Sequence, residues 1–338
     1  MKSNFLFLTA IAASMLCACS GEESASSVTK TNNLKKGVQA EIDALQKEAL
    51  ESRKQYYSLI PSKGITNVTT KSGVVISINP STFTVNGRHF NGAIKVEFIE
   101  IYKRSQMATA NKTTLGVADP ENQTDEVEGI DLWPLVSGGE FYVNMTTENG
   151  QQIDNGAEYS LTIPTGATGG TDPGMLAWNG TEDADGNVTW EKKTDTNGDP
   201  IPVTMGEQGG YQLNLDNFGW ANCDRFYSVP GPKTTILVDV PAGYDNTNSV
   251  VYLATAGEQN LLAPLDHYDA GTELFSEHYG HVPVGLSGYI IYVAGTTAGW
   301  EYEIIPVTFT PGLIVSVDPA LVLTGTQADV ENAIDALP

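Results

Sequence analysis

The feature that most constrains the fold is a series of short segments in which apolar, often β-branched side chains alternate with polar ones. Alternation with a period of two is typical of β-strands that bury one face. Asn79-Pro80 and Asn86-Gly87 are turn signals between the first segments. The clearest segments are residues 73–78, 82–85, 93–102, 139–145, 158–164, 234–241, 249–254, 288–294 and 300–305. The sequence therefore predicts a mainly β fold.

Length and turn content together predict two β domains. The chain has 338 residues, including 34 Gly and 17 Pro, which is enough for two cores of ordinary size. We expect two β-sandwich-like domains of immunoglobulin-like type, at residues 64–165 and 206–318. Between them, Asp/Asn/Gly turns flanked by short alternating segments are hairpin signals. Residues 166–205 are therefore interpreted as a hairpin-rich insertion.

Helical periodicity is found before the first β segment. Apolar or small residues from Val38 to Tyr56 recur at spacings of four and three, which predicts a helix within residues 35–60. The stripe contains Ala and Ser, which is weak for a coiled-coil seam. We therefore expect this helix to pack on the body or to form a stalk, with a partner helix as the alternative.

A second helix is expected at the end of the chain, within residues 319–338. Thr326 and Asp329 form a variant of the capping box, and Val330 and Ile334 share one helical face. These features predict a short C-terminal helix that lies on the second β domain.

Two local features carry separate expectations. In segment 93–102, apolar side chains compete for both faces, which indicates a β-bulge near Ile99. Cys223 follows the other two cysteines by about two hundred residues and stands among aromatic residues. A buried structural thiol is favoured there over a reactive one, because free cysteine usually behaves as a small hydrophobic residue.

The first residues have the pattern of a bacterial export signal with a lipidation site. An apolar run that ends at Leu16 is too short to span a bilayer as a helix. Leu16-Cys17-Ala18-Cys19 resembles the lipobox of bacterial lipoproteins. The resemblance implies a signal peptide at residues 1–18, covalent diacylglycerol and acyl lipid on Cys19, and a flexible tether at residues 19–34.

The charge balance disfavours one class of partner. The chain has 41 Asp and Glu against 18 Lys and Arg, a formal net charge of −23. Such a surface repels a polyanion, so no nucleic-acid partner is expected. It also repels an anionic bilayer, so the lipid is the expected attachment to the membrane.

Four stretches carry a family resemblance. They are residues 73–83, residues 92–102 with Met107 and residues 111–114, residues 137–141, and residues 218–226. Together they resemble a family of Bacteroidetes outer-membrane or surface lipoproteins of uncharacterised function. The first two are also similar in part to ZU5-type β-sandwich modules, although Asn79 precedes Pro80 where that motif has Ile. His89-Phe90-Asn91 lacks the nucleophile of self-cleaving ZU5 relatives, so the resemblance implies no autoproteolysis.

The resemblance also bears on location. Glu22 and Glu23 follow the lipidated cysteine closely, and acidic residues there resemble the Bacteroidetes signal for export to the outer face of the outer membrane. We therefore expect a lipid-anchored outer-membrane protein at the cell surface, with the periplasmic face as the alternative.

Two turns supply closely spaced oxygen atoms of the kind that calcium prefers. Neither completes an EF-hand, because the sixth position from Asp183 is Val188 rather than Gly and the twelfth is Thr194 rather than Glu. Both are interpreted as ordinary hairpin turns, with calcium as the alternative, and no other cofactor is expected. The residues concerned are Asp183, Asp185 and Asn187 in one turn, and Asp195, Asn197 and Asp199 in the other.

Trp178 and Trp190 flank the first of these turns. If the two rings were exposed, their faces could stack on sugar rings. Most aromatic residues of a β-sandwich are core residues or cross-strand pairs. Glycan binding by this pair is therefore a secondary hypothesis.

No sequence motif indicates catalysis. The chain has no G-x-S-x-G motif, no phosphate-binding glycine loop that ends in Lys-Ser/Thr, and no dinucleotide fingerprint. We therefore expect a non-enzymatic protein of the cell envelope that serves in binding, adhesion or scaffolding, for example by docking to an outer-membrane protein complex. Two alternatives stay open: a glycan-binding lipoprotein of a polysaccharide-uptake system, and a hydrolase with an unrecognised site.

Overall fold

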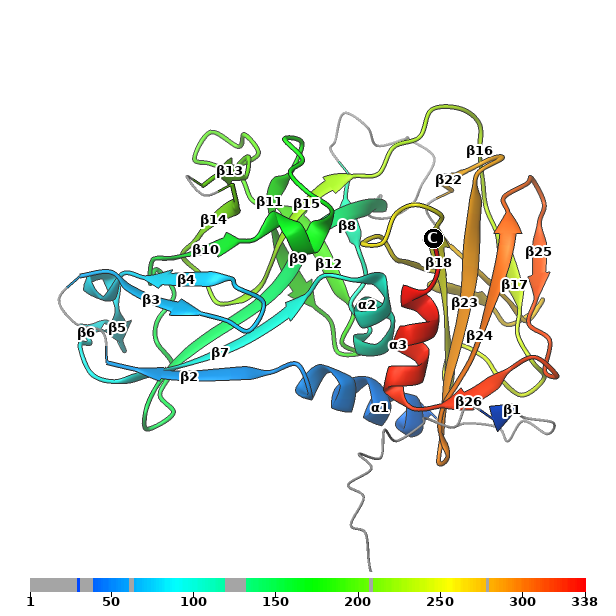
Figure 1. The fold of residues 1–338 in the computed structure, drawn as a ribbon, viewed down its shortest axis with the longest axis horizontal. Coiled ribbons are helices and arrows are strands. Elements are labelled where there is room, and N and C mark those ends of the chain that lie inside the picture. Colours follow the sequence, from blue (N-terminus) through cyan, green and yellow to red (C-terminus); the bar gives the residue numbers. More distant parts are fainter. Residues whose placement is uncertain (1–28, 31–38, 61–63, 119–131, 207–208, 278–279) are drawn as a thin grey trace, which may run out of the picture.

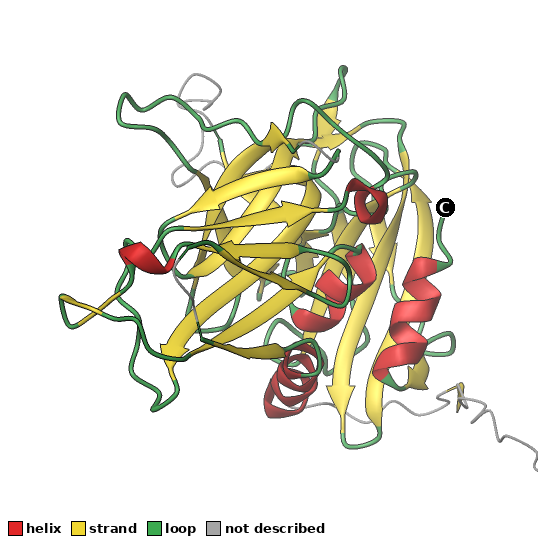
Figure 2. Ribbon diagram, turned by 60° about the vertical axis from the view of Figure 1, so that its left-hand side comes forward, coloured by secondary structure: helices red, strands yellow, loops and turns green. Residues whose placement is uncertain are grey.

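The computed structural model of the protein describes residues 29–30, 39–60, 64–118, 132–206, 209–277 and 280–338. The expected signal peptide and Cys19 lie outside the described residues, as does most of the tether. Strands make up 46% of the described residues and helices 13%, which confirms the mainly β prediction (Figure 2). Among the helices of the described ranges, none is long and apolar enough to cross a membrane.

The largest sheet has seven strands. In spatial order they are β15 (Gly219–Phe226), β11 (Leu176–Glu182), β12 (Val188–Lys192), β8 (Leu115–Val117), β9 (Leu132–Thr147), β7 (Ile94–Ile101) and β2 (Gln55–Leu59). Strand β15 also pairs with β9, from Gly219 opposite Val143 to Phe226 opposite Leu135. Strands β9, β15, β11, β12 and β8 therefore form a closed ring.

A five-stranded sheet faces this one. Its order is β13 (Thr204–Met205), β14 (Tyr211–Leu215), β10 (Tyr159–Ile163), β4 (Val75–Ile78) and β3 (Thr66–Thr69). Alternate side chains of the two sheets form one apolar cluster, with Ile76 and Leu161 from the smaller sheet and Phe98 and Val143 from the larger. Cys223 belongs to this cluster and is fully buried, which confirms the prediction of a buried thiol. We call these two sheets the first half.

The second half has a six-stranded and a four-stranded sheet. The first has the order β1 (Thr29–Lys30), β26 (Leu323–Gly325), β24 (Gly299–Thr308), β23 (Ser287–Thr296), β18 (Ser249–Thr255) and β19 (Ala263–Pro264). The second has the order β20 (His267–Asp269), β21 (Leu274–Ser276), β17 (Leu237–Asp239) and β25 (Ile314–Ser316). Val238, Phe275, Ile290 and Val315 pack in the apolar cluster that the two sheets share.

Shorter elements complete the chain. Two-stranded ladders pair β5 (Thr84–Val85) with β6 (Arg88–His89), and β16 (Lys233–Thr234) with β22 (Val282–Pro283). Single 3-10 turns occupy Pro80–Thr82 and Thr165–Thr168.

Helices α1 (Gln39–Glu51), α2 (Arg104–Ala110) and α3 (Gln327–Asp335) lie between the two halves (Figure 1). A third apolar cluster joins them to the ring and to the six-stranded sheet. It includes Ile42 and Ala49 of α1, Met107 of α2, Ile334 of α3, Trp190 of the ring and Ile291 of β23. The helices therefore form a middle layer, whose apolar cluster lies between the clusters of the two halves.

Backbone hydrogen bonds also join the halves directly. Thr114 N–H donates to Leu262 O at 3.0 Å, and Ser137 N–H donates to Asn260 O at 3.0 Å. The fully buried guanidinium of Arg104 donates to Thr255 O and Glu258 O, both at 3.1 Å. The segment between β18 and β19 is thus docked on the first half.

The predicted N-terminal helix is only partly correct. Helix α1 ends at Glu51, and residues 55–59 form β2, which pairs with β7 from Gln55 opposite Phe98 to Leu59 opposite Ile94. Tyr57 packs against the first apolar cluster, whereas Tyr56 is exposed. Pairing with the edge of a sheet therefore overrides the helical spacing of this short segment.

The expected insertion at 166–205 is wrong. Strands β11 and β12 form two of the five strands of the ring, and β14 and β15 extend the first half to Phe226. The expected domain start at residue 206 therefore falls inside the first half. The hairpin signals were correct, but pairing with strands far away in the sequence decides where a hairpin belongs.

The expected bulge near Ile99 is also absent from the described ladder. Strand β7 keeps a continuous register with β9, and Phe98 and Ile99 are both buried because they face different apolar clusters.

The C-terminal helix is confirmed as α3. Its capping box joins Thr326 and Asp329, and Val330 is fully buried.

Candidate functional site

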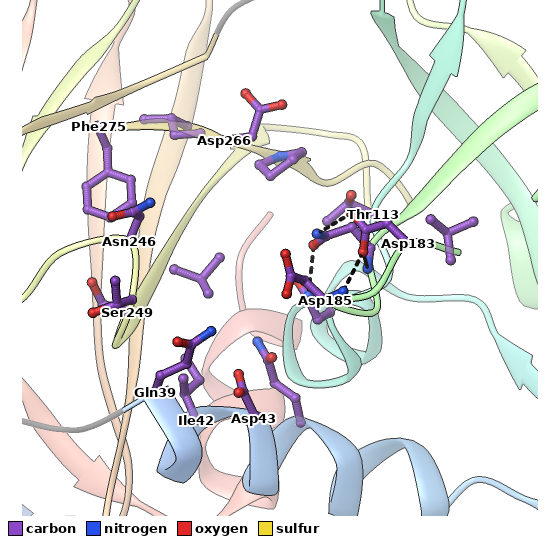
Figure 3. A pocket seen from close by; sticks show the side chains of 18 of the residues that line it. Gln39, Ile42, Asp43, Thr113, Asp183, Asp185, Asn246, Ser249, Asp266 and Phe275 are labelled. Atoms are coloured by element: carbon purple, nitrogen blue, oxygen red, sulfur yellow. Dashed lines mark hydrogen bonds between the residues drawn. The ribbon is translucent and has the colours of Figure 1, made fainter. Parts of the chain in front are cut away.

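A cavity of about 420 Å³ lies between the two halves, beside α1 (Figure 3). Its walls come from α1, from the turn between β11 and β12, from the segment that leads into β8, and from the region of β18 to β21. A second cavity of about 380 Å³ shares Asp43, Gln46, Asn111 and Asp185 with it. We call the two cavities together the central cleft.

The turn between β11 and β12 forms one wall of the central cleft. Asp183 Oδ1 accepts hydrogen bonds from the N–H groups of Asp185 and Asn187, both at 2.9 Å, and Asp183 Oδ2 accepts one from Asn187 Nδ2 at 3.0 Å. Burial raises the pKa of Asp183, but these hydrogen bonds outweigh it and the net shift is downward. The carboxylate of Asp183 is therefore committed to holding the turn.

Asn111 fixes this turn against the second half. It ends α2 in the left-handed conformation, with φ of 51°, which Asn tolerates better than most residues. Its Nδ2 donates to Asn187 Oδ1 at 2.9 Å, and its Oδ1 accepts from the hydroxyl of Tyr252 in β18 at 3.1 Å. One side chain thus connects three walls of the cleft.

Two carboxylates face the open space. Asp43 points from α1 and Asp185 from the turn (Figure 3). Burial raises the pKa of Asp43, and the negative charge of Asp185 raises it further. Within the described part of the chain, neither carboxylate forms a hydrogen bond or an ion pair. Both are therefore available as acceptors for a ligand.

Gln46 carries an unpaired amide nitrogen that is buried behind the surface of the cleft. It lies one helical turn after Asp43, is 8% exposed, and lines both cavities. Its Nε2 is buried and has no hydrogen-bond partner in the described structure. An unpaired buried amide costs about 1–3 kcal/mol, so a protein rarely keeps one without a reason.

Lys112, in the second cavity, is already paired. Its ammonium donates to Gly186 O and to Glu182 Oε1, and lies 5.5 Å from the centre of the Trp220 ring. Burial lowers the pKa of Lys112, while Glu182 and Glu140 partly offset that effect. This cation therefore stabilises the wall of the cleft and is not free for an anionic ligand.

The residues predicted from the sequence form three groups: the turn that begins at Asp183, the turn that begins at Asp195, and the pair Trp178 and Trp190. Asp183, Asp185 and Asn187 line the central cleft. Asp195, Asn197 and Asp199 form an exposed turn that lines neither cavity of the cleft, in which Asp195 Oδ1 accepts from Asn197 N–H at 2.8 Å and Asp199 N–H at 3.0 Å. No described group of three or more His, Cys, Asp or Glu residues could hold a metal ion.

Trp178 and Trp190 are fully buried, so the hypothesis that they form an exposed glycan platform is wrong. Both rings fill the space that the five-stranded ring encloses. Trp178 Nε1–H donates to Asp224 O and Trp190 Nε1–H donates to Thr113 O, each at 2.9 Å. Satisfied indole groups in an apolar interior are typical of core residues.

Sequence reasoning missed Asp43 and Gln46, because polar residues on a Lys- and Glu-rich helix are ordinarily solvated. The one available signal was that Gln46 follows Ile42 at i+4, on the apolar stripe of the helix. A polar residue on the buried side of an amphipathic helix indicates a local polar environment.

The chemistry of the cleft favours binding. Carboxylates, amides and hydroxyls line it, and none of the described histidines does. The larger cavity has four aspartates and no lysine or arginine among its described lining residues. No known protein-family model matches the chain, and no curated protein is similar to it in sequence. The geometry of the cleft therefore carries the functional argument.

Proposed function

We propose that this protein is a lipid-anchored, non-enzymatic binding protein of the cell envelope and that its ligand site is the central cleft. Lipid on Cys19 holds it on the outer membrane, at the cell surface. The two pairs of facing sheets serve as two β-sandwich-like units with the cleft between them. Surface binding also covers the adhesion and scaffolding roles expected from the sequence.

One observation carries the proposal: the carboxylates of Asp43 and Asp185 line both cavities of the cleft, have no hydrogen-bond or ion-pair partner in the described structure, and are close enough for the charge of Asp185 to raise the pKa of Asp43. Two carboxylates that lie near each other without a counter-charge repel each other in the folded protein. A ligand that donates hydrogen bonds or positive charge to both carboxylates relieves this repulsion. The cleft therefore has free groups to which a ligand can bind.

The rigidity of the walls supports the same role. The middle apolar cluster and Asn111 hold α1, the turn and β18 in fixed positions. A preformed cleft avoids the cost of ordering its walls when a ligand binds. Cavities of several hundred Å³ are in the usual range for small ligands.

The test is a thermal-shift screen of the mature protein with saccharides, amino acids, polyamines, divalent cations and short basic peptides. A bound ligand at one hundred times its Kd stabilises the protein by about 2.7 kcal/mol. We expect at least one compound to raise the Tm of the wild type but not that of Asp43→Asn. Glu48→Gln is the control, because Glu48 is exposed on the same helix outside the cleft. A screen without any Asp43-dependent shift contradicts the proposal.

The anchor is tested separately by fractionating cells that express Cys19→Ala. The variant should fold and leave the membrane fraction, because no other attachment is proposed. If it stays with the outer membrane after a high-salt wash, the lipid is not the sole attachment and a partner of the folded body holds it there.

A further inference from the structure

The accessible, unpaired side-chain groups that the two cavities share are all hydrogen-bond acceptors. Asp43 and Asp185 line both cavities, and their carboxylates have no described hydrogen-bond or ion-pair partner. Gln46 also lines both cavities. Its Nε2 is inaccessible to solvent, whereas its Oε1 is accessible and has no described partner. The cleft therefore presents two carboxylates and one amide oxygen at a single place.

The amide oxygen of Gln46 is a sign of a ligand that is independent of the carboxylates. The residue is only 8% exposed, and side-chain oxygens buried to this degree usually accept a hydrogen bond within the protein. A donor placed in the cleft can reach Oε1 but not Nε2. Gln46 therefore acts toward a ligand as an acceptor.

Three acceptors select the head group of the ligand. A primary ammonium has three N–H donors, no acceptor and a positive charge. Burial raises the pKa of Asp43, and the charge of Asp185 raises it further, so a cation between the two also relieves their repulsion. A hydroxyl donates only one hydrogen, and a carboxylate or phosphate donates none and is repelled. The acceptors therefore favour a primary ammonium.

The charges of the lining favour the larger cavity for this cation. Its described lining contains no lysine or arginine but four aspartates: Asp43, Asp183, Asp185 and Asp266. The smaller cavity is lined by Lys47 and Lys112, which repel positive charge. Lys47 does not neutralise Asp43, whose pKa is raised rather than lowered. A cation is therefore better accommodated in the larger cavity.

Aliphatic side chains in the larger cavity favour an organic cation over a metal ion. They belong to Ile42, Leu115, Val188, Val250 and Leu265. A hydrocarbon chain attached to the ammonium group can pack on them and leave water. A metal ion gains nothing from such walls, and no described group of three or more His, Cys, Asp or Glu residues could hold one.

We infer that the larger cavity of the central cleft binds a primary aliphatic amine, whose ammonium group donates hydrogen bonds to Asp43, Asp185 and Gln46 Oε1. The inference rests on the proposed function, since it names the ligand class of the same cleft. Free amines and lysine side chains carry this same head group on an aliphatic chain, and the experiment includes both.

The test is isothermal titration of the mature protein with n-pentyl compounds that differ only in the head group. They are n-pentylamine, trimethylpentylammonium, 1-pentanol and pentanoate. Cadaverine represents a free amine and Nα-acetyllysine amide represents a lysine side chain, while calcium chloride is the metal probe.

Two variants remove acceptors: Asp43→Asn, and Gln46→Met, which keeps the length of the side chain without the amide oxygen. Glu48→Gln is the matched control, because it removes the same charge from an exposed position of the same helix outside the cleft. This control separates a contact at the site from the general effect of net charge on a cation.

We expect n-pentylamine to bind the wild type and Glu48→Gln equally. Binding should be about tenfold or more weaker in Asp43→Asn and about threefold to tenfold weaker in Gln46→Met, as expected for a lost charged and a lost neutral acceptor. Trimethylpentylammonium keeps the charge but has no N–H donor, so it should bind about threefold or more weaker than n-pentylamine. Pentanol and pentanoate should not bind. Gln46→Met should keep the wild-type Tm or exceed it, because it removes an unpaired buried donor, and that result separates a ligand contact from a structural role.

Three results would overturn the inference. If n-pentylamine binds Asp43→Asn as tightly as the wild type, or no better than trimethylpentylammonium, these acceptors do not hold the ammonium group. If no amine binds, while another compound of the titration or of the thermal-shift screen binds in an Asp43-dependent manner, the ligand class is wrong and the proposed function stands. If no compound of either experiment shows Asp43-dependent binding, both fail.

Discussion

Glu140 of β9 lies directly opposite Asn222 of β15, and both carboxylate oxygens of Glu140 are buried without a hydrogen-bond partner in the described structure. Asp224, two residues beyond Asn222, is also fully buried. Burial raises the pKa of Glu140 from 4.5 to about 8, although Lys112 partly offsets it. Burial likewise raises the pKa of Asp224, and Glu140 adds to that effect.

The first prediction is that stability falls as the pH rises from about 4.5 to about 8. In that window folded Glu140 keeps its proton while unfolded Glu140 has released it, so the folded state binds more protons. The full shift corresponds to an upper bound on the order of 4–5 kcal/mol. Urea denaturation at pH 5 and pH 9 measures the difference.

Glu140→Gln should shrink this difference between pH 5 and pH 9 by about 1–3 kcal/mol, since Gln does not ionise. Glu48→Gln, on the exposed face of α1, should leave it unchanged. An equal pH dependence in the wild type and Glu140→Gln would show that Glu140 ionises normally in the folded protein.

The second prediction concerns the closed ring. An added Cβ at Gly116 would lie 2.7 Å from Leu135 Cδ1 and 2.8 Å from Trp178 Cζ3, closer than carbon atoms can approach. Gly116→Ala should therefore destabilise the protein by about 1–3 kcal/mol, as overpacking of a core does. Gly166→Ala is the matched control, because its Cβ would meet nothing within 4 Å. Chemical denaturation measures the free energy of unfolding of both variants. Equal stabilities would mean that the ring interior is loosely packed.

The third prediction concerns the ring tryptophans. Trp190 is fully buried and stacks edge-on against Trp220, with ring centres 6.4 Å apart. Trp190→Ala should cost about 3–5 kcal/mol of folding free energy. Tyr56→Ala is the comparison, because Tyr56 is 65% exposed and its loss should change stability by less than about 0.5 kcal/mol. A small effect at Trp190, with acrylamide quenching its fluorescence freely, would mean that the ring is exposed.

The fourth prediction concerns the junction between the halves. Leu262 N–H donates to Thr114 Oγ1 at 3.1 Å, and both residues are fully buried. Thr114→Val keeps the shape but leaves this N–H unpaired, which should cost about 1–3 kcal/mol. Calorimetry should show a single transition for the wild type, because the middle apolar cluster couples the halves. Thr181→Val, at an exposed position of β11, should behave as the wild type; two separate transitions in the wild type would mean that the halves unfold independently.

The sequence could predict the strands because alternation is a local property. Segments 249–254 and 288–294 correspond to β18 and β23 with shifts of one or two residues. The sequence could not predict that β7 is covered on both faces, because Ile99 and Ile101 belong to the middle apolar cluster, to which α1, α3 and β23 contribute from distant parts of the chain. The expected bulge near Ile99 rested on the assumption that one face of this strand contacts solvent.

The candidate site was predicted only in part, for the same physical reason. The Asp183 turn could be found because its residues are adjacent in the sequence. Its relation to Asp43 and Gln46 depends on where α1 packs, and nothing in the helix itself specifies that position. Partners that are separated by about 140 residues become visible only when the fold brings them together.

The closed ring also determines the order in which the chain can complete its fold. Strand β9 needs β15 to close the ring, and β15 ends at Phe226. The middle apolar cluster needs α3, which ends at Asp335. During synthesis from the N-terminus, the central layer therefore cannot form until residue 335 has been made. Such non-local closure slows folding and leaves the apolar faces of earlier elements in contact with solvent in the meantime.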